Sequence, residues 1–267
     1  MRNGWSLIRH AGLPVHCVIT CVMGGVGTSA MADEAPTVTP YRPSVSSPAA
    51  LSAPGWVEVE AGVQNSRGED ASRRVTLPYT FKLAFTPDWG VRIGGDALVR
   101  QTEGGGAAQR GGGDITIVLK RRFELNDDSA WGLELATKLP TARKGLGSGR
   151  ADTGVNAIYS SDFAPGWHTD LNLAVTRIGG VPAGQSRWQQ AWATSVSRNL
   201  SEQWGVGGEL AGTRQGGNAS TAQALFAASY AVSRKLSLDV GVSKGLNAAS
   251  GAWSAFAGLT FLAARVF

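Results

Sequence analysis

His168 is the residue of this sequence best placed for acid–base chemistry, because it follows Trp167 directly and precedes Asp170 by two positions. A histidine beside a carboxylate can serve as a general base in a hydrolase. The sequence offers no cluster with metal-ligand spacing, no phosphate-binding loop and no nucleophile elbow to accompany it. We therefore predict that this histidine is structural, that the protein is not an enzyme, and that it holds no metal or cofactor.

Charged residues at alternating positions form a second pattern that could do chemistry. Acids and bases are mixed in near balance, and two interpretations stay open. The charges form a network of ion pairs that rigidifies a narrow interior, or they line a polar path that selects solutes by charge and shape. The residues expected to face this interior are Glu58, Glu60, Lys82, Arg92, Asp96, Arg100, Asp114, Lys120, Arg122, Glu134, Lys138, Asp152, Asp170, Arg187, Glu209 and Asp239.

Long β-strands are the elements that must position these charges. Apolar and polar residues alternate with a period of two, as in a strand with one apolar face. In one run, Val75, Leu77 and Tyr79 share a face, and Arg74 and Thr76 lie on the other. We predict strands near residues 55–64, 73–85, 89–101, 112–124, 129–141, 150–161, 166–177, 186–199, 203–214, 219–232, 235–246 and 251–267.

The lengths of these strands and of their connections indicate a membrane barrel. The strands exceed the usual length of about 5–6 residues in globular proteins but suit a tilted crossing of a bilayer. Short turns alternate with longer connections that are richer in glycine, as periplasmic turns alternate with external loops. No run of 18 or more apolar residues occurs outside the N-terminus, which argues against a membrane-spanning helix. The fold class predicted is therefore all-β: a transmembrane antiparallel up-and-down β-barrel of about twelve strands.

Tryptophans mark the starts of strands. Trp56, Trp89, Trp131, Trp167 and Trp204 each follow a short turn or the N-terminal leader, once per hairpin. An indole is apolar and carries one N–H that prefers water, so such residues collect at the membrane interface. We predict an interface girdle at these positions. The alternative interpretation is a set of core tryptophans in a soluble β protein.

The N-terminal segment has the pattern of an export signal. Arg2 and Arg9 precede an apolar run, and Ala30-Met31-Ala32 supplies a small-x-small cleavage site. We predict a signal peptide at 1–32, a Pro/Ser-rich periplasmic leader at 33–54 that is loosely tethered or disordered, and a barrel domain at 55–267. Cys17 and Cys21 fall within the signal, so the mature chain would contain no cysteine. Its net charge, about +3 without the signal, is too small and too dispersed to indicate nucleic-acid binding.

Three segments carry a resemblance to a known family. They are GDITIVLK at 113–120, KLPT at 138–141 and KGLGSG at 144–149, followed by Asp152. This layout resembles the outer-membrane transporter family of the meta-pathway of phenol degradation, although Ala142 stands where that pattern usually has glycine. The resemblance implies a β-barrel that transports hydrophobic or aromatic compounds. At the motif positions we expect Asp114, Lys120, Lys138 and Asp152 to form one cluster of charges in the lumen.

The leading hypothesis is a passive channel of the bacterial outer membrane for small, aromatic or hydrophobic solutes. A non-conducting barrel with a structural or partner-binding role is the second, and an outer-membrane enzyme is the third. The expected partners are outer-membrane lipids, the barrel-assembly machinery and a small-molecule solute.

The C-terminal Phe267 resembles the aromatic signal that the barrel-assembly machinery reads. We expect it to continue the lipid-facing row of Leu259 and Phe261, which Arg265 interrupts. Either Arg265 extends to the headgroups or a local bulge turns it inward.

Overall fold

The computed structural model describes residues 36–68, 72–103 and 106–267. The signal peptide predicted at 1–32 and the first residues of the leader lie outside the described residues. No helix in the described part of the chain is long and apolar enough to cross a membrane.

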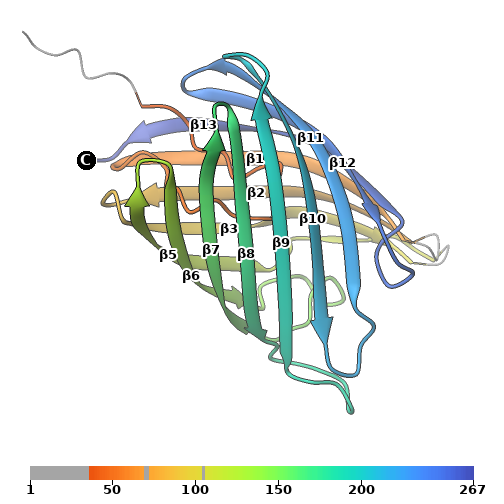
Figure 1. The fold of residues 1–267 in the computed structure, drawn as a ribbon. Coiled ribbons are helices and arrows are strands. Elements are labelled where there is room, and N and C mark those ends of the chain that lie inside the picture. The colour runs from red at the N-terminus through yellow and green to blue at the C-terminus, as the bar shows by residue number, and fades with distance from the viewer. Residues whose placement is uncertain (1–35, 69–71, 104–105) are drawn as a thin grey trace, which may run out of the picture. The chain divides into compact units, whose positions relative to one another are not determined.

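Twelve long strands form one closed antiparallel β-barrel (Figure 1), which confirms the predicted fold class. Each strand pairs with its neighbours in sequence, and pairing of β1 with β13 closes the barrel. A further short strand, β4 (Gln109–Gly111), pairs with the end of β3. The long strands are β1 (Trp56–Arg67), β2 (Arg73–Ala84), β3 (Trp89–Thr102), β5 (Ile115–Asn126), β6 (Ser129–Leu139), β7 (Asp152–Ala164), β8 (Trp167–Arg177), β9 (Trp188–Asn199), β10 (Trp204–Gln215), β11 (Thr221–Ser233), β12 (Leu236–Gly245) and β13 (Trp253–Arg265).

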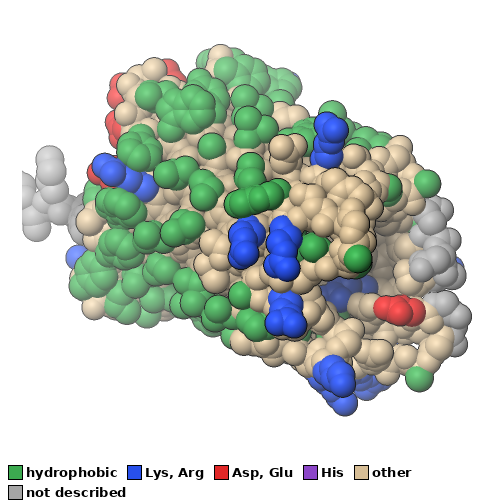
Figure 2. Space-filling model, turned by 90° about the horizontal axis from the view of Figure 1, so that it is seen from below, with side chains coloured by type: hydrophobic (Ala, Val, Ile, Leu, Met, Phe, Trp, Pro, Cys, Tyr) green, Lys and Arg blue, Asp and Glu red, His purple; other side chains and the backbone are tan. Residues whose placement is uncertain are grey.

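The two faces of the barrel wall have the polarity opposite to that of a soluble protein. Leu173 and Phe226 on the outer face are 70% and 67% exposed, whereas Glu58 and Lys82 on the inner face are 0% and 2% exposed. Hydrophobic side chains gather over much of the surface seen in Figure 2. Contiguous apolar surface on this scale is unfavourable in water. The outer face therefore suits the hydrocarbon interior of a membrane.

The connections differ between the two ends of the barrel. One end has only short turns, such as Pro165-Gly166 between β7 and β8, where Gly166 has a φ of 74° that favours glycine. The other end carries the longer connections, including residues 140–151 and 178–187. We call these the short-turn end and the long-loop end.

A bulge near the C-terminus settles the position of Arg265. Val57 pairs with Ala264 but Glu58 pairs with Leu262, so one extra residue is inserted in β13. The bulge inverts the alternation and places Arg265 opposite Trp56, which has the parity of Glu58. The expectation that Phe267 continues the apolar row is wrong, because the bulge breaks that row and the strand ends before this residue.

Candidate functional site

Strand pairing places most of the predicted charges on one surface, the inner wall of the barrel. Glu58 lies opposite Lys82, and Lys82 lies opposite Arg92 on the next strand. Further around the wall, Lys120 lies opposite Glu134. These residues come from five different strands, so the closed barrel, rather than any local motif, brings them together.

The mid-lumen network consists of three acids and three bases that pair with one another. Lys82 Nζ lies 2.6 Å from an oxygen of Glu58 and 2.6 Å from an oxygen of Glu60. Arg92 and Lys120 each place a nitrogen 3.5 Å from Glu134 Oε1; the six members of the network are Glu58, Glu60, Lys82, Arg92, Lys120 and Glu134. Most of these side chains are buried, where an unpaired charge would be costly.

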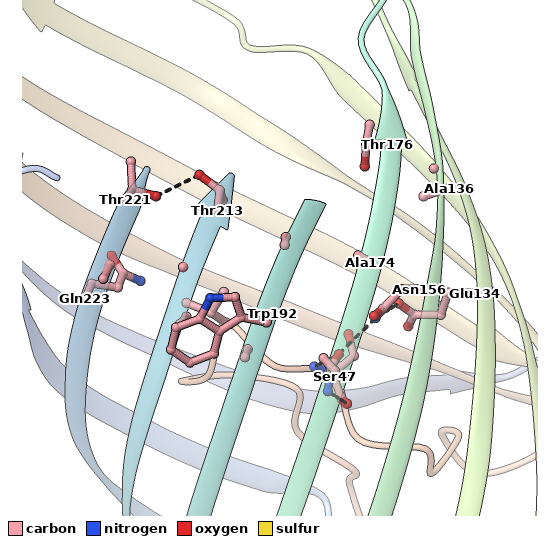
Figure 3. Close-up of a pocket in the computed structure, with 18 of the residues that line it drawn as sticks. Ser47, Glu134, Ala136, Asn156, Ala174, Thr176, Trp192, Thr213, Thr221 and Gln223 are labelled. Atoms are coloured by element: carbon pink, nitrogen blue, oxygen red, sulfur yellow. Dashed lines mark hydrogen bonds between the residues drawn. The ribbon is translucent and has the colours of Figure 1, made fainter. Parts of the chain in front are cut away.

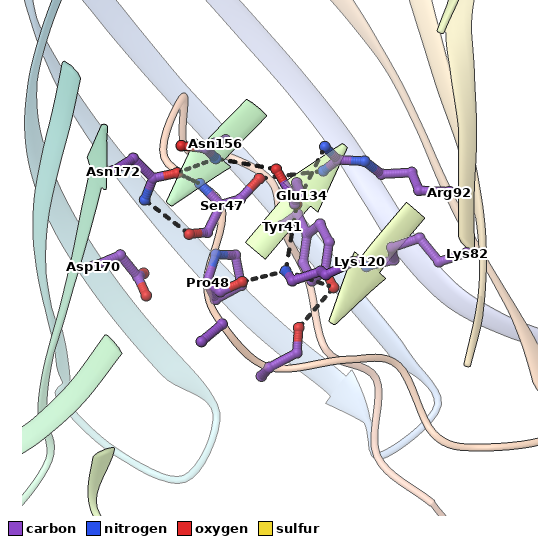
Figure 4. A network of polar contacts seen from close by, with 12 residues as sticks. Tyr41, Ser47, Pro48, Lys82, Arg92, Lys120, Glu134, Asn156, Asp170 and Asn172 are labelled. Atoms are coloured by element: carbon purple, nitrogen blue, oxygen red, sulfur yellow. Dashed lines mark hydrogen bonds and ion pairs between the residues drawn. The ribbon is translucent and has the colours of Figure 1, made fainter. Parts of the chain in front are cut away.

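A segment that precedes the barrel completes this network. Residues 36–54, which we call the lumen strap, enter the interior and place Tyr41 at its centre (Figure 4). The Tyr41 ring lies 4.0 Å from Lys82 Nζ and 4.3 Å from Lys120 Nζ, and its backbone N–H donates to Glu60 at 2.7 Å. Lys120 donates to the hydroxyl of Tyr41 and to the carbonyl of Pro48. Burial raises the pKa of the Tyr41 hydroxyl, so this group stays neutral.

The strap then crosses the lumen to the opposite wall. Arg42 pairs with Asp239 at 3.0 Å. The Glu209 carboxylate accepts from the backbone N–H groups of Val45 and Ser46 and from the hydroxyls of Ser44 and Ser46. These neutral donors satisfy the buried charge of Glu209 without a cation among the described residues.

Two further contacts fix the far part of the strap. Asn172 accepts from the N–H of Ser47 at 3.0 Å and donates to its carbonyl at 2.9 Å. The N–H of Ala49 donates to Ser160 Oγ at 2.7 Å. The prediction of a loosely tethered leader is therefore wrong for residues 36–54, because inward-facing side chains satisfy backbone groups along the segment.

The strap separates two cavities in the lumen. The outer cavity, towards the long-loop end, has a volume of about 490 Å³, and Val45 and Ser47 form part of its floor. Figure 3 shows Ser47, Asn156 and Glu134 at one end of this cavity, and the bonded pair Thr213 and Thr221 towards the other. The inner cavity has a volume of about 370 Å³ and is lined by Ser44, Ser46 and Pro48. Residues 44–48 therefore face the two cavities in alternation, so the partition is a single chain thick at this point, whereas residues 39–43 line the inner cavity alone.

The other predicted residues lie away from the mid-lumen network, in one cluster and several separate contacts. At the long-loop end, Lys138 Nζ lies 2.6 Å from Asp152 and 3.5 Å from Asp114. The motif residues thus meet in part, since three form this cluster while Lys120 belongs to the mid-lumen network. The remaining contacts are Asp96 with Arg74 at 3.5 Å, Arg122 with Glu124 at 2.8 Å, and the exposed Arg187 with the Gly179 carbonyl at 3.2 Å.

Arg100 requires a correction. Leu77 pairs with Leu98 but Pro78 pairs with Asp96, so β3 contains one extra residue at a bulge. Beyond the bulge Arg100 lies opposite Val75, on the outer face, and the buried Val99 takes the inward position. Simple alternation along the sequence cannot anticipate this inversion.

His168 lies at the start of β8 near the short-turn end. Its Nδ1 is 2.6 Å from Asp162 Oδ1 and its Nε2 is 3.1 Å from Asp170 Oδ1. Both ring nitrogens therefore contact carboxylates, and neither is placed to take a proton from a hydroxyl. This geometry favours a structural role over a catalytic one.

The predicted girdle tryptophans lie in the first residues of their strands at the short-turn end of the barrel. Trp56 differs from the others because it has the inward parity of Glu58. Trp131 packs on Tyr159 with ring centroids 5.2 Å apart, and Trp204 packs on Tyr230 at 4.9 Å. Trp89 and Trp167 lie beneath the guanidinium groups of Arg121 and Arg198 at 5.1 and 5.0 Å, and Trp56 lies 4.9 Å from Lys235 Nζ.

Sequence reasoning did not identify the residues that hold the strap in the lumen. Tyr41 and Arg42 are the only aromatic and the only basic residue between positions 33 and 54, which is a signal that could have drawn attention to them. Asn172 and Ser160 occupy inward positions of their strands but carry no charge, so the pattern of alternating charges does not mark them.

The fold and the polar, strap-filled lumen define a barrel of the outer-membrane type. The chain belongs to the family of the MetA-pathway of phenol degradation, whose model matches residues 91–263. A comparison with curated protein sequences finds no match.

Solved structures show the same architecture. The COG4313 outer membrane channel from Pseudomonas putida F1 is 13% identical with a TM-score of 0.66, over 80% of this chain and 97% of that chain. The KdgM porin is 10% identical with a TM-score of 0.56, over 78% of this chain and 100% of that chain. The CymD monoaromatic hydrocarbon channel is 9% identical with a TM-score of 0.50, over 80% of this chain and 90% of that chain. At these identities the similarity establishes the fold.

Proposed function

We propose that the protein is a channel of the bacterial outer membrane for small solutes, and that the lumen strap closes it in the conformation seen here. The observation that carries this proposal is that the strap, one chain thick, separates two cavities in the lumen. A barrel built only for rigidity has no need of two lumen cavities that are each large enough for a small molecule. Passage then requires the strap to move aside, and the long-loop end faces the outside.

The outer cavity supports a small solute with an apolar body. Its wall contains Ala136, Ala174 and Ala191, and its floor carries the amides of Asn156 and Asn172. A mainly apolar pocket with a few convergent polar groups is typical of small-molecule sites. The family's connection with phenol degradation and the monoaromatic hydrocarbons named for CymD agree with such a solute.

A reversible cross-link tests whether the strap must move. Ser46 Oγ and Ser195 Oγ lie 3.0 Å apart, one on the strap and one on β9. We expect Ser46→Cys with Ser195→Cys to abolish single-channel openings in planar bilayers when oxidised and to restore wild-type openings when reduced. The mature chain is predicted to lack other cysteines, which makes Ser195→Cys alone a clean control.

The same experiment separates the channel from a non-conducting structural barrel. A strap this well anchored is also what a permanently closed barrel would need. Absence of openings and of solute uptake into liposomes in both the reduced and the wild-type protein would support that second function. Equal conductance before and after oxidation would show that solutes pass beside the strap.

Phe267 is proposed to be the assembly signal. It is exposed and lies beyond the end of β13, so a partner protein can reach its ring. We expect deletion of Phe267 to lower the fraction of heat-modifiable, folded barrel in outer membranes several-fold, and Phe267→Tyr to retain it because the aromatic ring is kept. Normal assembly of the deletion variant, scored by the electrophoretic shift between unheated and heated samples, would refute the role.

A further inference from the structure

The charges on the outer face of the barrel are of one sign. Among the described strand residues that share the apolar face, the charged side chains are arginines and lysines, whereas the acidic strand residues follow the inward parity. Six of these bases lie at the long-loop end of their strands and are exposed: Arg67, Arg73, Arg100, Arg177, Arg214 and Lys244. A cation within the hydrocarbon would cost about 2–4 kcal/mol, but near the interface this cost falls to about 0–1 kcal/mol. Their position therefore indicates the level of the lipid headgroups.

Tryptophans place these bases at the membrane boundary. Arg177 lies opposite Trp188, and Trp253 lies opposite both Arg67 and Lys244. Indoles prefer the headgroup level, where an apolar ring and a polar N–H are both satisfied. At the short-turn end, by contrast, the outward Arg121 and Arg198 already cover tryptophan rings.

Two of the arginines at the long-loop end line a concavity on the outer surface of the barrel. Arg67 on β1 lies directly opposite Arg73 on β2. Like charges in this cross-strand position repel each other unless an anion lies between them. A hollow on the outer surface is lined by Asn65, Arg67, Arg73 and Trp253, and Arg73 Nε donates to Asn65 Oδ1 at 3.0 Å. Within the described residues, neither guanidinium has a carboxylate within ion-pair distance.

We propose that this concavity binds a phosphate group of a phosphorylated glycolipid in the external leaflet, of the lipid A type. Guanidinium groups bind phosphate through paired, charge-assisted hydrogen bonds, and both arginines line the hollow. Trp253 packs at the boundary between headgroup and acyl chains, and the acyl chains lie on the apolar strands below. This proposal rests on the outer-membrane location but not on conduction through the lumen.

Lipid titration of the purified barrel tests the site. Bisphosphorylated lipid A is added to the protein in detergent micelles, and native mass spectrometry measures the bound fraction. We expect Arg67→Gln with Arg73→Gln to weaken binding by roughly tenfold or more, because each charge-assisted hydrogen bond is worth about that factor. The matched control, Arg121→Gln with Arg198→Gln, removes the same charge at the opposite end and should change binding less than about twofold.

Further arms identify the ligand and the charges that bind it. Phosphatidylglycerol, which has a single phosphate and no sugar, should bind the wild-type barrel more weakly; equal affinity would overturn the glycolipid assignment. If both double variants lost the same amount of lipid A binding, the effect would come from net charge and not from this site. The sequence places Glu69 and Asp70 between the two arginines, and Glu69→Gln with Asp70→Asn should retain or strengthen binding. Weaker binding in that variant would contradict an arginine–phosphate site.

The channel proposal can fail independently of this one. The Arg67→Gln, Arg73→Gln barrel should keep the single-channel behaviour of the wild type, since both side chains lie outside the lumen. Loss of lipid binding with unchanged conductance supports the lipid site whatever the strap does. Loss of conductance with unchanged lipid binding would overturn the assignment of these arginines to the membrane surface.

Discussion

Deletion of residues 36–50 is expected to convert a closed barrel into a persistently open one. This part of the strap supplies the contacts to Asp239, Glu209 and Asn172 that hold the partition in place. A hydrogen bond contributes about 1 kcal/mol net, and a bond to a charged group contributes more. Losing such bonds favours the open state, and the deletion also removes the partition itself. Single-channel recording should therefore show long-lived openings in place of rare ones.

A variant of unchanged length guards against a defect in export or folding. Glu209→Ala with Asn172→Ala removes two anchors on the barrel wall and should raise the open probability in the same direction. The matched control is Ser66→Ala with Ser254→Ala, because these hydroxyls bond to each other at 2.8 Å and line neither cavity. Conductance that stays at the wild-type level in the deletion variant would mean that the strap is not the barrier.

Replacement of Lys82 by methionine is expected to be the most destabilising single change in the lumen. The ammonium group of Lys82 pairs with Glu58 and Glu60 and donates to the carbonyl of Thr39 at 2.6 Å. Methionine fills a similar volume but leaves two buried carboxylates without a cation. Removing one partner of a buried ion pair costs about 3–5 kcal/mol. Urea unfolding in detergent should show a loss of that size.

Two comparisons identify the cause of this loss. Lys138→Met removes a lysine with two acidic neighbours at the long-loop end, where its side chain is 26% exposed, and should cost only about 0–1 kcal/mol. Lys82→Met combined with Glu58→Gln and Glu60→Gln should recover much of the stability, because the amides accept hydrogen bonds without a charge. Similar unfolding midpoints for Lys82→Met and Lys138→Met would show that the mid-lumen network is hydrated rather than buried.

The alternation of apolar and polar residues predicted which face most side chains of the barrel wall take, because it depends on strand geometry alone. Side chains of a strand point in turn to lipid and to lumen, so Val75 and Leu77 must face away from Arg74 and Thr76 wherever the strand runs regularly. The rule fails at bulges. One inserted residue turned Arg100 outward and Arg265 away from the lipid-facing row. A bulge depends on the fit between neighbouring strands, which one strand's sequence does not contain.

The sequence by itself determined the barrel, its inward charges and its aromatic strand starts, because each follows from local period, residue type and turn chemistry. Only the tertiary structure decided what those charges do. Glu209 shows the reason: its nearest donors are Ser44 to Ser46, more than 160 positions away in the chain. A segment rich in proline and serine cannot bury enough apolar surface to fold alone. It becomes ordered because a closed wall of carboxylates, amides and ammonium groups satisfies its backbone from many sides.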